Sequence, residues 1–95
     1  IINLYIKILL MKNYFEKIKK KLNDEIKFEE IKIVDNSHLH KGHKFFSSEK
    51  LHLQLKIKSI YLQSMTRVNA QRLIMKVLKE ELKTKIHALE ILIEK

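Results

Sequence analysis

Residues 50–58 read KLHLQLKIK, an unbroken alternation of polar and apolar side chains. Successive side chains of an extended chain point to opposite faces, so this pattern predicts a β-strand with one buried and one polar face. The aliphatic residues would lie on the buried face, and His52 would lie on the polar face near the start of the strand. Such a strand needs a covering layer over its apolar side only.

Two further elements are expected before this strand. Residues 28–35 are rich in β-branched side chains and run into the polar Asp35-Asn36-Ser37, which predicts a short strand that ends in a turn. Between Phe15 and Leu22 apolar residues recur at helical spacing among lysines, which predicts an amphipathic helix over residues 11–22. The chain would then continue from the short strand through an irregular loop.

Two more elements are expected after the alternating strand. Apolar residues at helical spacing predict a longer helix over residues 70–82, with Ser64 or Thr66 as a candidate N-terminal cap. Residues 86–94 alternate again, which predicts a third strand with His87 on the same side as Leu89. A strand–helix–strand unit favours a parallel pair joined by a right-handed crossover. We therefore expect an α+β fold of order αββαβ, with helices packed on one face of a three-stranded mixed sheet.

The composition restricts the chemistry. A chain of 95 residues with 45% hydrophobic residues suits one small domain with a single core. Cysteine is absent, which excludes a disulfide scaffold and thiolate ligands, and favours an intracellular location such as the cytosol or a mitochondrion. Five histidines and the carboxylates remain as possible metal ligands.

The charge is strongly positive, with 20 Lys and Arg against 11 Asp and Glu and a formal net charge of +9. This excess would attract nucleic acid, an anionic membrane or an acidic protein. Only Arg67 and Arg72 are arginines, the residue type expected where phosphates or guanines are bound bidentately. They are the candidate nucleic-acid contacts. The lysines near the start of the chain are most simply a solvated helix face, with an anion-binding patch as the alternative.

Residues 1–10 are apolar except for Asn3 and Lys7, but a membrane-spanning helix needs about 20 such residues. They do not begin with methionine, whereas Met11 is a plausible start. We expect either an N-terminal extension or processed remnant over residues 1–10, or an apolar turn packed on the domain. The domain itself would cover residues 11–95.

Three of the five histidines, His38, His40 and His43, lie close together in the loop before the long strand, beside the only glycine, Gly42. Their spacing is a weak signal for a zinc or nickel site formed by the loop alone, because no rigid scaffold accompanies it. Ser37 and His40 are near neighbours, but no glycine-rich elbow or paired acidic group suggests catalysis. The sequence does not predict an enzyme.

Several short motifs resemble those of BolA proteins over residues 11–95. They are Ile86-His87-Ala88-Leu89 preceded by Glu80-Glu81-Leu82, Asp35-Asn36-Ser37 followed by His40, Gly42 and His43, and His52 at the start of the second strand. The chain departs from the family where an arginine-histidine-arginine run is replaced by Ala70-Gln71-Arg72, and where phenylalanine-x-glycine is replaced by Leu62-Gln63-Ser64. These departures affect the basic helix start and leave the histidine motifs intact.

The resemblance implies a fold like the second type of KH domain and a heterodimer with a monothiol glutaredoxin around a shared [2Fe-2S] cluster. The partner and glutathione would provide thiolates, while His87 would be the principal histidine ligand and His40 the loop ligand. His38, His43 and His52 would be auxiliary residues. The isolated chain would be monomeric and would bind no cofactor.

The resemblance also leaves a second function open, that of a nucleic-acid-binding regulator of the BolA type that uses the KH-like fold and its basic surface. KH domains clamp the nucleic-acid backbone with a glycine-x-x-glycine loop, and this chain has only Gly42. Weak and salt-sensitive binding through Arg67 and Arg72 is the form in which we expect this activity.

Overall fold

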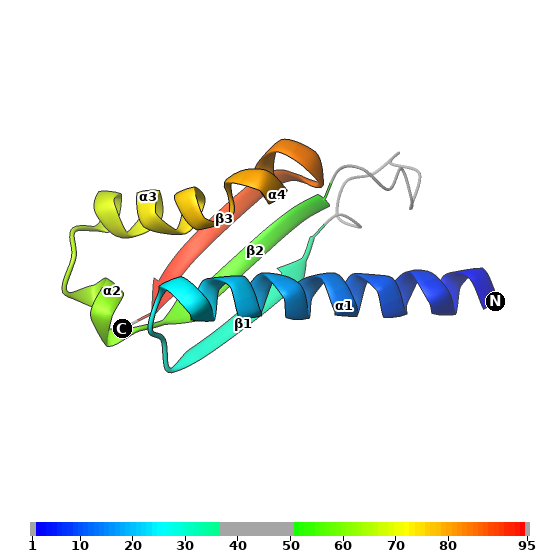
Figure 1. Ribbon diagram of the computed structural model, residues 1–95, viewed down its shortest axis with the longest axis horizontal. Helices are drawn as coiled ribbons and strands as arrows, with labels where there is room; N and C mark the ends of the chain where they lie inside the picture. The colour runs from blue at the N-terminus through cyan, green and yellow to red at the C-terminus, as the bar shows by residue number, and fades with distance from the viewer. Residues whose placement is uncertain (1, 37–50, 95) are drawn as a thin grey trace.

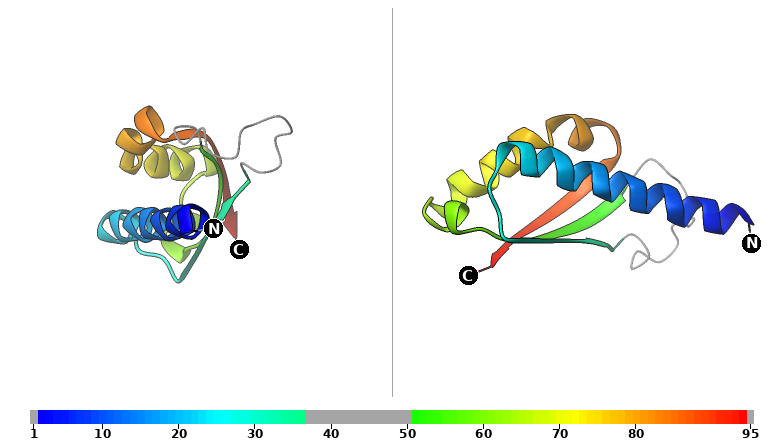
Figure 2. Two further views of the ribbon diagram at one scale, coloured as in Figure 1. Left: turned by 90° about the vertical axis from the view of Figure 1, so that its right-hand side faces the viewer. Right: turned by 60° about the horizontal axis from the view of Figure 1, so that its bottom comes forward.

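The computed structural model describes residues 2–36 and 51–94. The elements follow in the order α1 (Ile2–Glu25), β1 (Glu30–Asp35), β2 (Leu51–Lys58), α2 (Ile60–Gln63), α3 (Arg67–Val77), α4 (Lys79–Thr84) and β3 (Ile86–Glu94). One sheet has the order β1-β2-β3, in which β1 is antiparallel and β3 is parallel to β2. The helices lie over one face of the sheet (Figures 1 and 2). The α+β class and the mixed three-stranded sheet are therefore as predicted.

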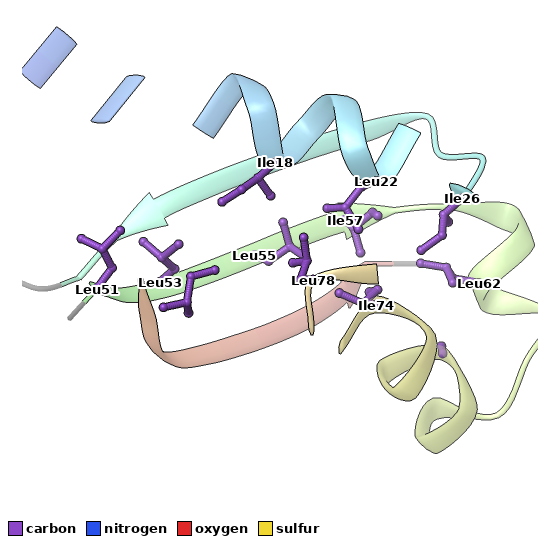
Figure 3. Close-up of a cluster of buried hydrophobic side chains, with 12 residues drawn as sticks. Ile18, Leu22, Ile26, Leu51, Leu53, Leu55, Ile57, Leu62, Ile74 and Leu78 are labelled. Carbon is purple, nitrogen blue, oxygen red and sulfur yellow. The ribbon is translucent and has the colours of Figure 1, made fainter. Parts of the chain in front are cut away.

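The central strand β2 provides the floor of the core. Its four aliphatic residues are at most 8% exposed, and the polar residues between them face away from the helices. Side chains from α1, α2, α3 and the α3–α4 junction pack onto this floor (Figure 3). The fully buried members include Leu22, Leu62, Ile74 and Leu78. One apolar layer between helices and sheet thus holds all the elements together.

The first helix is longer than predicted at both ends. The sequence pattern indicated residues 11–22, whereas α1 runs without a break from Ile2 to Glu25. Residues 2–25 contain no glycine or proline that would interrupt a helix. The first residues of α1 extend past the end of the sheet (Figures 1 and 2).

The predicted helix over residues 70–82 is two helices, with a third short helix before them. The chain leaves helical geometry at Leu78, where φ is −96° and ψ is 21°, and α4 follows directly. Leu78 is fully buried, so the bend keeps an apolar side chain in the core. Of the two candidate caps, Thr66 caps the N-terminus of α3, where its hydroxyl oxygen accepts a hydrogen bond from the Asn69 amide at 3.2 Å. Ser64 instead donates its hydroxyl to the Tyr61 carbonyl.

The strands match their predicted positions closely. β1 begins at Glu30, two residues later than predicted, and β3 covers residues 86–94 as predicted. The backbone amide of Asn36 donates to the carbonyl of His52 at 2.7 Å, which continues the pairing of β1 with β2 by one residue. Most of the predicted loop lies outside the described residues.

Candidate functional site

His87 is the second residue of β3, and it is an extra residue in the pairing with β2. Leu51 pairs with Ile86 and the next residue of β2, His52, pairs with Ala88, so β3 contains a β-bulge at His87. The His87 side chain is exposed. The prediction that it shares a side with Leu89 was wrong, because the bulge breaks the simple alternation at this point.

The core explains why the bulge forms here. Ile86 is only 2% exposed and Leu89 packs against the core cluster, yet the two residues are three positions apart. In a regular strand, residues three apart face opposite sides of the sheet. One extra residue lets both apolar side chains face the helices, while His87 and Ala88 stay exposed.

The His87 ring lies against the ring of His52 on the neighbouring strand. Their centroids are 5.3 Å apart and the rings are inclined at 63°, an edge-to-face arrangement. His52 is half-buried and belongs to the polar face of β2, as predicted. The two histidines therefore lie at the same end of the sheet, next to Leu51, which is the first described residue after the loop. The backbone carbonyl of His52 accepts the hydrogen bond from the Asn36 amide at this end.

The loop histidines His38, His40 and His43 lie outside the described residues. Over residues 2–36 and 51–94, no group of three or more His, Asp or Glu side chains is arranged to hold a metal ion. A metal site that includes His87 would therefore need ligands from the segment between Asn36 and Leu51 or from another molecule. That segment joins the sheet at the end where His52 and His87 lie.

Arg67 and Arg72 are both exposed on α3. They are five positions apart, which places them about 140° apart around the helix axis. The two positions therefore lie on different sides of α3, which is not the arrangement of a single phosphate clamp.

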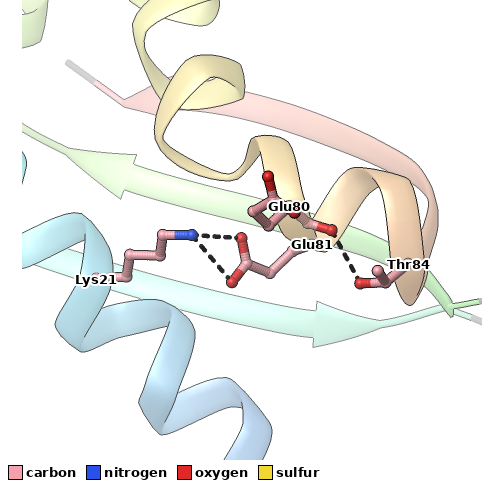
Figure 4. A network of polar contacts seen from close by, with 4 residues as sticks. All are labelled: Lys21, Glu80, Glu81 and Thr84. Carbon is pink, nitrogen blue, oxygen red and sulfur yellow. Dashed lines mark hydrogen bonds and ion pairs between the residues drawn. The ribbon is translucent and has the colours of Figure 1, made fainter.

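A partly buried ion pair between α1 and α4 was not predicted from the sequence. The Lys21 ammonium donates to both carboxylate oxygens of Glu81, at 2.9 and 3.2 Å (Figure 4). The Glu81 side chain is 9% exposed and that of Lys21 is 37% exposed. The sequence contains a sign that Glu81 is buried, because Glu81 follows the buried Ile74 and Leu78 at helical spacing. A buried carboxylate normally needs a positively charged partner.

Tyr14 lies near this pair. Its hydroxyl oxygen is buried and has no hydrogen-bond partner among the described residues. Burial, followed by the negative charge of Glu81, raises the pKa of Tyr14 to about 12. The Lys85 ammonium lies 5.1 Å from the centroid of the tyrosine ring, within the range of a cation–π contact.

Residues 22–94 match the family model described as BolA-like protein. The chloroplastic protein BOLA1 of Arabidopsis thaliana is 34% identical over 84 residues, which cover 85% of this chain and 52% of that protein. An uncharacterized protein in the cobS 5′ region of Sinorhizobium sp is 35% identical over 78 residues, 80% of this chain and 84% of the relative. The chain thus spans about half the length of the chloroplastic relative.

Solved structures show the same architecture. The BolA domain of SufE1 from Arabidopsis thaliana superposes with a TM-score of 0.69 at 35% identity, over 83% of this chain and 87% of that one. BolA1 from the same plant gives a TM-score of 0.66 at 32% identity, over 82% and 86% of the two chains. The sheet order, the histidine-alanine-leucine run at the start of β3 and these matches agree, and the chain belongs to the BolA-like protein family.

Proposed function

We propose that this chain is a non-enzymatic partner of a monothiol glutaredoxin and supplies histidine ligands to a [2Fe-2S] cluster shared between the two proteins. The observation that supports it best is the placement of His87. Its imidazole is exposed at a bulge, beside His52, at the sheet end where the histidine-bearing loop joins β1 and β2. The chain would act in the assembly or transfer of such clusters.

The donor set suits a shared cluster. The chain has no cysteine, so the thiolates that iron–sulfur clusters require would come from the glutaredoxin and glutathione. Neutral imidazole ligates iron, and replacing a thiolate with it makes the cluster less negative and raises its reduction potential. In this proposal His87 is the principal ligand and His40 the second ligand, while His38 and His43 can substitute for His40.

His52 has a supporting role in this proposal. Its ring packs edge-to-face against His87, and its own backbone carbonyl is held by the Asn36 amide. Residues that pack against or hydrogen-bond a ligating histidine fix the orientation of the ring that binds the metal. His52 would thus position His87 without being a ligand itself.

To test the proposal, the chain is mixed with a monothiol glutaredoxin, glutathione and an iron–sulfur donor. Visible circular dichroism then monitors whether a cluster is assembled on, or transferred to, the pair of proteins. The unmodified chain should produce a signal that differs from that of the glutaredoxin alone. His87→Ala should abolish this change and His40→Ala should weaken it, whereas Arg72→Ala, an exposed substitution on α3, should leave it intact. No spectral change with the unmodified chain, or an unaltered change with His87→Ala, would exclude the proposal.

The same variants test the loop-only alternative. A zinc or nickel site formed by the loop histidines alone should retain its metal affinity in His87→Ala and lose it in His40→Ala. Equilibrium dialysis with each metal distinguishes this result from a shared cluster.

The exposure of Arg67 and Arg72 supports a second candidate, weak nucleic-acid binding. If the arginines contact phosphates, each Arg→Ala change should reduce the slope of log affinity against log salt by about 1. The wide angle between them favours separate and nonspecific contacts. Sequence preference that survives at high salt would instead place this candidate first.

The proposal places the chain inside a cell, in the cytosol, a mitochondrion or a plastid, the last because one relative is described as chloroplastic. We expect the isolated chain to be monomeric and free of bound cluster. Size-exclusion chromatography of the purified chain, with and without the loaded glutaredoxin, would check both expectations.

A further inference from the structure

The first residues of α1 form an exposed apolar segment that the rest of the described chain does not cover. Six large apolar side chains between residues 4 and 10 are 45% to 69% exposed: Leu4, Tyr5, Ile6, Ile8, Leu9 and Leu10. Packing against the core begins only at Met11 and continues at Tyr14 and Phe15. In Figures 1 and 2 this part of α1 projects beyond the sheet. We call residues 4–10 the apolar tip.

The apolar tip is apolar around most of its circumference. Residues advance by about 100° around a helix, so the six apolar residues cover an arc of about 240°, and Lys7 lies in the remaining arc of about 120°. A surface helix that packs on its own domain has one apolar stripe and a polar remainder. Lys7 is the single charged residue in the tip. An apolar arc of this width is much broader than the stripe that a surface helix needs to pack on its own domain.

A lysine-rich surface follows the apolar tip directly. Lys12, Lys17 and Lys20 are exposed, and they lie within an arc of about 140° around α1. Glu16 lies in the same region, but it pairs with Lys19 at 3.2 Å, so the surface keeps an excess of positive charge. An apolar end followed by a lysine-rich surface matches the order of acyl chains and phosphate headgroups in a membrane leaflet.

We propose that the apolar tip inserts into the interface of an anionic phospholipid bilayer, with Lys12, Lys17 and Lys20 against the headgroups. The tip is only roughly 10 Å long, far less than a hydrocarbon core of about 30 Å, so it enters one leaflet and does not span it. Among the described residues no helix is long and apolar enough to cross a membrane. This inference goes beyond the proposed function and does not depend on it.

Charge distinguishes the bilayer from a second copy as the occupant. Two copies joined through their apolar tips would bring their two lysine-rich surfaces together, on chains that each carry a formal charge of +9. Anionic lipid headgroups instead attract each basic residue near the surface. The same lysines that oppose self-association therefore favour the membrane.

Co-sedimentation of the full chain with vesicles tests the proposal, with phosphatidylcholine alone compared with phosphatidylcholine mixed with phosphatidylserine. The chain should bind the anionic vesicles at least about tenfold more strongly, and high salt should weaken the binding. Ile8→Asn/Leu9→Asn should reduce the affinity by about tenfold or more, because two buried apolar side chains are lost. Lys17→Glu/Lys20→Glu should reduce the preference for phosphatidylserine.

The matched control is Ile60→Asn/Val68→Asn, which changes two other exposed apolar residues, 72% and 56% exposed, on α2 and α3. Its binding should equal that of the unmodified chain. Circular dichroism melts would check that each variant is folded. Equal binding by the tip variant and the control, or no binding to anionic vesicles, overturns the proposal. A lipid-free dimer that Ile8→Asn/Leu9→Asn dissociates would assign the tip to a second copy.

Discussion

The imidazole rings of His52 and His87 meet edge to face across two parallel strands, with their centroids 5.3 Å apart. Both residues lie outside the apolar core, so we expect His52→Ala and His87→Ala to change the free energy of unfolding by no more than about 0.5 kcal/mol. His52→Ala should nevertheless shift the ring proton resonances of His87, because a neighbouring aromatic ring is removed.

Proton NMR of the histidine ring region checks this contact, and chemical denaturation checks stability. Unchanged His87 resonances in His52→Ala would contradict the contact. Arg72→Ala, an exposed substitution on α3, is a suitable control because it leaves the two rings in place.

Removal of Lys21 should lower the free energy of unfolding, because it leaves the Glu81 carboxylate without its ion-pair partner. Lys21→Met should destabilise the protein by roughly 1 to 3 kcal/mol, because Glu81 is almost buried and would lose its partner. Lys21→Met/Glu81→Leu should be less destabilised than Lys21→Met, since the double change leaves no unpaired charge. Urea denaturation of Lys21→Met, Glu81→Leu and the double variant measures the coupling energy between the two residues. Strictly additive changes in the free energy of unfolding would contradict the ion pair.

Ser59 joins the α1–β1 connection to the start of α2. It is fully buried, its hydroxyl donates to the Lys27 carbonyl at 2.6 Å, and the same oxygen accepts from the Leu62 amide at 3.1 Å. Ser59→Ala removes both hydrogen bonds and the N-terminal cap, at an expected cost of about 1 to 2 kcal/mol. Ser64→Ala, an exposed position near the end of α2, should cost much less in the same denaturation experiment.

Tyr14 predicts a specific loss of stability at alkaline pH. Its pKa is about 12 in the folded protein and 10.0 for an unperturbed tyrosine, so the folded state holds this proton more tightly. The resulting stabilisation is complete below pH 10 and is lost as the pH rises towards 12. Tyr14→Phe should therefore lose less stability than the unmodified chain across this window.

Thermal melts from neutral pH to pH 12 compare the two proteins. At neutral pH Tyr14→Phe should be as stable as the unmodified chain or more stable, because the buried hydroxyl has no partner among the described residues. Parallel stability curves for the two proteins would show that Tyr14 makes no such contribution.

Much of the sheet is predictable from the sequence, because a half-buried strand repeats every two residues. The alternation in residues 50–58 and 86–94 identified β2 and β3, and the helical segment between them implied their parallel arrangement. The start of α1 was not predicted, since the helix was recognised by a narrow apolar stripe among lysines, whereas residues 4–10 are apolar around most of the helix. The break at Leu78 also gave no compositional signal, because leucine is a good helix former.

The candidate site is predictable only in part. The resemblance selected His87 and His52, and the fold brings these two rings together. The alternation pattern put His87 on the wrong side of β3, although the apolar Ile86 and Leu89, three positions apart, were a sign that the period was interrupted. The roles of His38, His40 and His43 remain predictions.

Because His87 is an extra residue in β3, the side chain at this position does not depend on how β3 packs against the core. Ile86 and Leu89 hold β3 to the core on either side, while the bulged position contributes nothing to that packing. Its side chain can therefore change, for instance to cysteine, without a compensating change in the core. Selection or design can change the residue at this position independently of the stability of the fold.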